Sequence, residues 1–196
     1  MNTVHFERGS AMNNLATSKE ALLDISVNLA SEKGMNALNI RNIAKLGGIS
    51  VGCVYNYFPS KTSLVTATVE KIWANIFQQA KQGSQPQGFQ ACVRWIFDSI
   101  RNGSEQYPSF FTLHAMSFAA DEIGEGRAVM NRFFDHIKMD LLKALREDAD
   151  VHREVFSDTF REIDFVNFVF DNLIMLSMKQ TSSCDFLLNL IQKVIY

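Results

Sequence analysis

Apolar residues recur along most of the chain at spacings of three and four, the period of an amphipathic helix. Leu22, Ile25 and Leu29 form the first such stripe; it predicts a helix that begins at Thr17, with Glu20 at capping-box spacing, and ends before Gly34. Further helices are predicted at residues 61–82, 87–102, 108–120, 125–148, 154–179 and 184–195. No stretch alternates like a strand, so the pattern predicts an all-α protein.

Two short helices around a glycine turn are predicted between residues 39 and 58. Asn39 is placed to cap the first helix, Gly48 can adopt the positive φ of a sharp turn, and Ser50 is placed to cap the second helix. On the second helix, Val54 and Phe58 form the inner face. The opposite face is left for a partner and carries Val51, Gly52, Cys53, Tyr55 and Asn56. This arrangement predicts a helix-turn-helix.

The free face of the second helix has the composition of a surface that reads DNA. Small residues at the start of the helix permit close approach to a groove, while Tyr and Asn can hydrogen-bond to phosphates or base edges. Pro59 and Ser60 separate this helix from the next, which places Lys61 in a first helical turn. A phosphate there would contact both the free amide groups and Lys61, so double-stranded DNA is the predicted partner.

These motifs together resemble the tetracycline-repressor (TetR) family, as judged from Ile43-Ala44, Gly48-Ile49-Ser50, Tyr55-Asn56-Tyr57-Phe58 and Pro59-Ser60-Lys61. The resemblance covers the first third of the chain closely and implies that the second helix of the motif enters the major groove while Lys61 contacts phosphate. Asn39 stands where the family usually has Thr, Gly47 where it often has Ala, and Cys53 where a small polar residue is common. The predicted DNA-binding residues are Asn39, Arg41, Ser50, Val51, Gly52, Cys53, Tyr55, Asn56, Tyr57 and Lys61.

The chain divides into three predicted parts. Residues 1–15 lack a helical period and are predicted to be a disordered leader, with Met12 as an alternative start. Residues 16–62 are the predicted three-helix DNA-binding domain, and residues 63–196 the helical regulatory and dimerisation domain. The net charge is −2, but the segment from Ala16 to Lys61 carries five cations against three acids, so the acidity lies downstream.

Composition narrows the class of protein further. The chain has an odd number of cysteines, and their positions lack the spacing of metal ligands: Cys53, Cys92 and Cys184. This pattern indicates reduced thiols in a cytoplasm. No membrane span, glycine-rich phosphate loop or paired metal ligands are found, so no cofactor, no metal and no enzyme activity are predicted. The alternative left open is a helical small-molecule-binding protein or enzyme with a vestigial helix-turn-helix.

The last two predicted helices are apolar around most of their circumference and need cover on several sides. Two copies of the chain forming a four-helix bundle would provide it, and the family resemblance implies the same homodimer. The predicted dimerisation residues are Phe165, Val169, Leu173, Leu176, Leu187, Leu190, Ile191 and Val194.

The region from Trp95 to Met178 is rich in Phe and Met, which is typical both of an apolar ligand pocket and of an ordinary core. The candidate ligand-binding residues are Trp95, Phe97, Phe110, His114, Phe118, Phe134 and Phe168. The predicted function is that of a ligand-responsive transcriptional repressor, which binds a near-palindromic operator as a dimer and is released by a small apolar effector.

Overall fold

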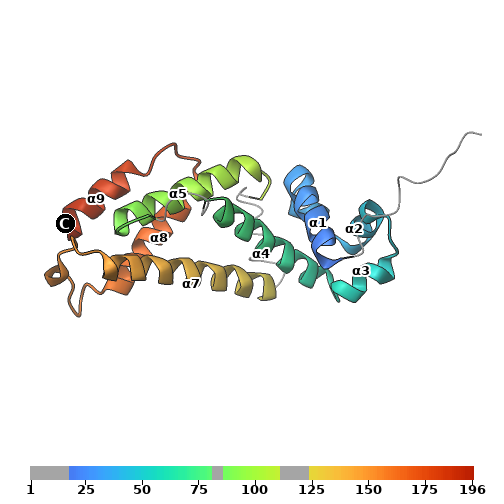
Figure 1. Cartoon of the computed structure of the whole chain (residues 1–196), viewed down its shortest axis with the longest axis horizontal. Helices are drawn as coiled ribbons and strands as arrows, with labels where there is room; N and C mark the ends of the chain where they lie inside the picture. The colour runs from blue at the N-terminus through green and yellow to red at the C-terminus, as the bar shows by residue number, and fades with distance from the viewer. Residues whose placement is uncertain (1–17, 81–85, 111–123) are drawn as a thin grey trace, which may run out of the picture.

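The chain folds into an elongated arrangement of helices in the computed structural model, which describes residues 18–80, 86–110 and 124–196 (Figure 1). The helices are α1 (Lys19–Lys33), α2 (Ile40–Gly47), α3 (Val51–Tyr57), α4 (Lys61–Ala80), α5 (Phe89–Gln106), α7 (Gly124–Glu147), α8 (Glu162–Met178) and α9 (Asp185–Ile195), with short 3-10 turns at Met35–Ala37 and Arg153–Val155. The all-α prediction is confirmed. The predicted leader lies outside the described residues.

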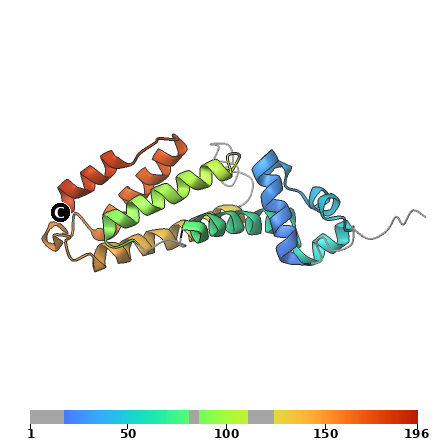
Figure 2. The same ribbon diagram turned by 45° about the horizontal axis from the view of Figure 1, so that its top comes forward.

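The helices form two groups that share α4. Helices α1 to α3 lie at one end of the molecule, and α5, α7, α8 and α9 lie at the other (Figure 1). The turned view in Figure 2 shows α1 crossing over one half of α4 while α5 and α7 run beside the other half. Helix α4 contacts α1, α5 and α7, so it is the structural link between the groups.

Most predicted helices are found with shifted ends. The first helix is capped by Ser18, whose side chain accepts a hydrogen bond from the Ala21 amide at 3.1 Å, one residue after the predicted start at Thr17. Gly34 ends this helix at φ 79°, as predicted. The helix predicted at residues 108–120 falls largely outside the described residues, and its first residues, 108–110, form a turn.

The helix predicted over residues 154–179 is wrong at its beginning. Residues 153–155 form a 3-10 turn, and a single β-bridge joins Ser157 and Phe160 before α8 begins at Glu162. The polar run between Phe156 and Phe160 favours a turn. The rings of these two phenylalanines stack at 5.5 Å, and both pack against Phe165.

Aromatic rings join the second half of α4 to the rest of the core. The Trp73 indole is 1% exposed; it stacks on Phe133 of α7 with ring centroids 5.2 Å apart and meets Phe110 edge-on at 5.7 Å. Helices α4 and α5 also pack closely at Gly103, where an added Cβ would lie 2.7 Å from the Ile76 side chain. The position of α4 is therefore tightly coupled to the body around it.

The last residue of the chain is held at the far end of the body by a carboxylate. Asp148 accepts hydrogen bonds from the Tyr196 hydroxyl at 2.5 Å and the Phe89 amide at 2.7 Å. Partial burial tends to raise the pKa of Asp148, but these bonds, with those from the Asp150 amide and the nearby Arg153 charge, outweigh it and lower the pKa below its ordinary value. The ionised form of Asp148 is therefore favoured in the folded protein.

Helices α8 and α9 turn their strongest apolar stripes inward. Five predicted dimerisation residues are already buried within one protomer: Phe165, Val169, Leu173, Leu187 and Ile191. Leu176, Leu190 and Val194 are half-buried. The exposed large apolar side chains on these helices are instead Phe168 (48% exposed), Met175 (49%) and Phe186 (85%).

The three cysteines are free, and Cys92 and Cys184 are buried. None of the helices in the described ranges is both long and apolar enough to cross a bilayer.

Candidate nucleic-acid interface

The first helix of the motif begins at a side-chain cap. The Asn39 side-chain oxygen accepts a hydrogen bond from the Asn42 amide at 2.8 Å, as the sequence predicts, and the Asn42 side chain donates to the Ala37 carbonyl at 2.9 Å. These bonds fix the start of α2. Arg41, in the first turn of this helix, is exposed.

A left-handed glycine makes the turn between α2 and α3. Gly48 has φ 65° and ψ 26°, and the amide of Ile49 donates to the Ala44 carbonyl at 3.0 Å, which closes the end of α2. A residue with a side chain would be strained at this φ, so the glycine is required by the backbone. Ile49 packs against the core inside the turn, as predicted.

Helix α3 presents two different faces. The Ser50 side chain caps it by accepting from the Cys53 amide at 3.2 Å, and Val54 and Phe58 are buried in the hydrophobic core. Val51 is 39% exposed and Tyr55 49% exposed. Gly52 and Asn56 are also exposed, while Cys53 and Tyr57 are half-buried. The predicted inner and outer faces are thus arranged as the sequence indicates.

Lys61 stands beside this face at the start of α4. Ser60 and Ser63 cap that helix reciprocally: the Ser60 hydroxyl accepts from the Ser63 amide at 3.0 Å, and the Ser63 hydroxyl accepts from the Ser60 amide at 3.1 Å. The Lys61 side chain is exposed between them. An exposed cation at a capped helix start suits a phosphate, because the macrodipole there also favours an anion.

The cations of the motif are free of neutralising partners. Arg41, Lys45 and Lys61 are exposed, and none forms an ion pair with any residue of the described chain. The nearby acids are engaged elsewhere, since Glu20 and Asp24 of α1 face Lys71 of α4. The hydrogen bond to Glu20 raises the pKa of Lys71. Lys45 was counted in the sequence-derived charge but was not predicted as an interface residue.

The candidate ligand-binding residues are only partly brought together. Trp95, Phe110 and Phe134 surround α4: Trp95 contacts Phe77 at 5.6 Å, while Phe110 and Phe134 meet Trp73 at 5.7 and 5.8 Å. Phe97 is buried, and Phe168 lies on the surface. His114 and Phe118 lie outside the described residues. The rings around α4 contact one another, as in a packed core.

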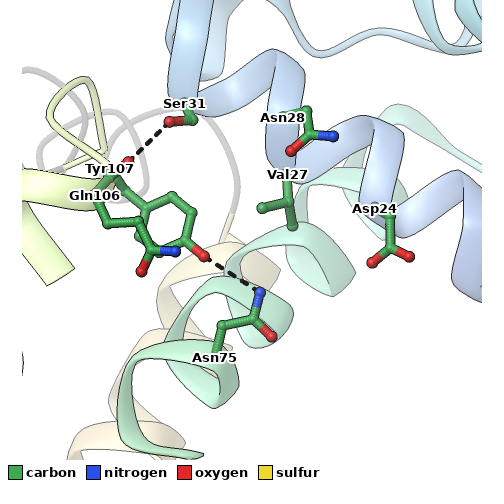
Figure 3. Close-up of a pocket in the computed structure, with 7 residues that line it drawn as sticks. All are labelled: Asp24, Val27, Asn28, Ser31, Asn75, Gln106 and Tyr107. Carbon is green, nitrogen blue, oxygen red and sulfur yellow. Dashed lines mark hydrogen bonds between the residues drawn. The ribbon is translucent and has the colours of Figure 1, made fainter. Parts of the chain in front are cut away.

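A polar cavity between the two groups of helices was not predicted from the sequence. It is lined by residues of α1, α4 and the end of α5, which lie far apart in the chain (Figure 3). The available signal was weak: Asn28 and Asn75 are amides within otherwise amphipathic helices, and a polar residue there also suits an exposed helix face.

Comparison with known families agrees with this geometry. Residues 22–68 match the family of bacterial regulatory proteins described as the tetR family, a range that runs from α1 into α4 and contains the whole helix-turn-helix and Lys61. Residues 22–68 therefore form a DNA-binding domain of the TetR family. The match indicates a DNA-binding regulator rather than an enzyme, and it confirms the resemblance seen in the sequence.

Proteins similar to this chain include nucleoid occlusion factors. It is 26% identical over 132 residues to the nucleoid occlusion factor SlmA of Glaesserella parasuis serovar 5 (strain SH0165), an alignment covering 65% of this chain and 64% of that protein. It is also 26% identical over 145 residues to SlmA of Actinobacillus pleuropneumoniae serotype 5b (strain L20), covering 71% and 70%. The chain thus spans just under two thirds of the first relative and slightly more of the second.

Solved structures share the fold. The transcriptional regulator SCO7222, a TetR from Streptomyces coelicolor, superposes with a TM-score of 0.60 at 13% identity, covering 84% of this chain and 70% of that chain. The ketosteroid transcriptional regulator KstR2 of Mycobacterium tuberculosis gives a TM-score of 0.50 at 16% identity, covering 92% and 97%. At these identities the likeness concerns the fold alone.

Proposed function

We propose that this TetR-family regulator binds a near-palindromic duplex site as a homodimer and acts as a transcriptional repressor. The observation that supports the proposal is the exposed face of α3, which carries Tyr55 and Asn56. The same end of the molecule has three exposed cations, Arg41, Lys45 and Lys61, that lack acidic partners in the described chain. An α-helix of this kind fits the major groove, where base edges are distinguishable, while the cations contact the phosphates on either side.

A single copy of α3 is too short to specify a site. Its seven residues span about 10 Å, so its side chains reach only a few base pairs. Two copies related by a two-fold axis would read two half-sites separated by one helical turn, roughly 34 Å, or a multiple of it. The operator symmetry then follows from the symmetry of the dimer.

The surface proposed for dimerisation lies on α8 and α9. Phe168 and Met175 on α8 and Phe186 on α9 are large, apolar and exposed in one protomer. Half-buried Leu176, Leu190 and Val194 belong to the same two helices. Burying these side chains against a second copy would cover apolar surface that is otherwise in contact with water.

Release from DNA is proposed to follow from the binding of a small apolar effector near the aromatic side chains around α4. That helix extends about 30 Å from the DNA-binding end into the body. A ligand that shifts its far end would move the module at its near end, and coupling of this kind typically changes affinity by about 5- to 150-fold.

Selection of bound sequences from a random duplex library tests the proposal, with sedimentation of the purified chain alongside. We expect a dimer at micromolar concentration and an enriched, near-palindromic sequence bound by one dimer. A monomer that enriches no sequence would contradict it, and would favour the alternative of a helical small-molecule-binding protein with a vestigial motif.

The similarity to SlmA supports a second candidate, a nucleoid occlusion factor. Mapping of the bound sites along the chromosome separates the two candidates. Sites concentrated at one or a few promoters, with transcripts that rise when the gene is deleted, favour the repressor. Many sites without such transcript changes, together with an effect on cell division, favour the nucleoid occlusion factor.

A further inference from the structure

A cavity of about 430 Å³ lies where the DNA-binding end meets the body. Figure 3 shows α1 on one side and α4 and the end of α5 on the other, with side chains of all three elements turned to the space between them. Its lining contains one aliphatic side chain and six polar residues: Val27, and Asp24, Asn28, Ser31, Asn75, Gln106 and Tyr107. A site so lined suits a polar ligand rather than an apolar one.

Two hydrogen bonds already cross this junction. The Ser31 hydroxyl donates to the Gln106 carbonyl at 3.0 Å, and the Asn75 side-chain amide donates to the Tyr107 hydroxyl at 3.3 Å. They hold α1 against the end of α5 and fix the Tyr107 ring over α4. The walls of the cavity therefore have a defined geometry without a ligand.

Three other polar residues of the lining, Asp24, Asn28 and Gln106, are exposed where the cavity opens to solvent, so a ligand can reach them. The side-chain amides of Asn28 and Gln106 make no hydrogen bond within the described part of the chain. The Asp24 carboxylate is 3.9 Å from the Lys71 ammonium, whose closer partner is Glu20. The cavity thus offers two amide groups, which can both donate and accept, and a carboxylate that is only loosely paired.

The balance of charge selects among polar ligands. Asp24 is the one charged residue in the lining, and the adjacent group of Glu20, Asp24 and Lys71 has a net charge of −1. An anion would be repelled, while a single ammonium group would be attracted. Amides arranged around a cavity are well matched to hydroxyl groups.

We propose that this cavity is a regulatory site for a small, singly charged amine that carries several hydroxyl groups, such as an amino sugar. The ammonium group would bind Asp24, and the hydroxyls would bind the amides of Asn28 and Gln106. Because the ligand would touch α1 on one side and α4 and α5 on the other, its occupancy would change the tilt of the DNA-binding end. This coupling to DNA rests on the proposed function, whereas binding of the amine to the cavity does not.

Titration calorimetry of the full chain without DNA tests the site, with D-glucosamine as the probe and D-glucose as its uncharged match. We expect saturable glucosamine binding at millimolar concentration, and weaker binding of glucose. Asp24→Asn should weaken glucosamine binding about twofold to fivefold and leave glucose binding unchanged, because only the contact with an exposed charge is lost. Gln106→Ala should weaken the binding of both sugars. Glu32→Gln removes a carboxylate from the same helix outside the cavity, and it should not change the binding of either sugar.

Absence of saturable glucosamine binding, or equal binding by the wild type and Asp24→Asn, would overturn the assignment of the site. The regulatory part is tested by the affinity for the selected duplex with and without saturating glucosamine, where a change of about 5- to 150-fold is expected. An unchanged DNA affinity would refute the coupling. Failure to bind any duplex in the absence of glucosamine would instead refute the proposed function, so the two failures are distinguishable.

Discussion

Removal of the Lys61 side chain should change how the affinity for DNA depends on salt. Each phosphate neutralised by a cation contributes about 0.9 to the slope of log K against log salt concentration. If the three unpaired cations Arg41, Lys45 and Lys61 each contact one phosphate, a dimer makes six such contacts, and the expected slope is about −5.4. Lys61→Ala leaves four contacts and a slope of about −3.6.

The difference is large enough to measure. Between 50 and 200 mM salt, the wild type should lose about 1,800-fold in affinity and the variant about 150-fold. Fluorescence anisotropy with a labelled duplex across this range gives both slopes. Sequence preference should be unchanged, because a phosphate contact carries no base information. Lys61 is exposed at a helix start, so its replacement by Ala should not lower the melting temperature.

Lys33→Ala is the matched control. Lys33 is also an exposed cation of the DNA-binding end, but it lies in the last turn of α1, two residues beyond Ser31, whose hydroxyl contacts the body. Its removal should leave the slope as it is. Equal slopes for the wild type and Lys61→Ala would show that Lys61 does not neutralise a phosphate, and would remove the reason for placing the start of α4 on the DNA backbone.

Three further outcomes are expected. Gly103→Ala should lower the free energy of unfolding by about 1–3 kcal/mol in urea unfolding, because its new methyl group meets Ile76. In the double variant with Ile76→Ala, the loss should be smaller than the sum of the two single losses, and additive losses would contradict the clash. Asp148→Asn should lower the free energy of unfolding by about 1.5 kcal/mol at pH 7. Since the pKa of Asp148 is lowered in the folded protein, that difference should shrink as the pH falls below the unfolded value of about 3.9, and a constant difference down to pH 3 would refute the role of its charge. Phe168→Asp should weaken dimerisation at least about tenfold by sedimentation, while Met139→Asp, at an apolar position on α7 that is somewhat more exposed, should not. Equal effects would place the interface elsewhere.

Local chemistry accounts for what could be predicted from the sequence. The caps at Asn39 and Ser50 and the left-handed turn at Gly48 each depend on one residue and its nearest neighbours. The two faces of α3 follow from the spacing of its apolar residues alone. For these reasons the residues of the candidate interface, apart from Lys45, are predictable from the sequence.

Features that depend on tertiary contacts were not predictable in the same way. An apolar circumference shows that α8 and α9 are covered on several sides, but not which side faces their own protomer. The sequence alone therefore cannot predict that Phe165 and Ile191 are buried within a single chain. The beginning of α8 was placed too early because Val155 and Phe156 continue a helical period. The acids Glu162 and Asp164, which suit a helix start, were the available signal.

The cavity could not be predicted because Asp24, Asn75 and Gln106 are separated by about fifty and thirty residues in the chain. Nothing in the local sequence of each residue identifies the other two. Only the packing of α1 across α4 and the end of α5 brings them to one place.

The sharing of α4 has a consequence for how the protein unfolds. Leu64 and Val69 from its first half and Trp73 and Ile76 from its second half belong to one continuous hydrophobic core. A fragment ending at residue 62 would lack the helix that covers α1, so the DNA-binding end cannot be expected to fold by itself. Heat should therefore melt both ends in one cooperative transition, and a molecule that binds at either end should raise the melting temperature of the whole chain.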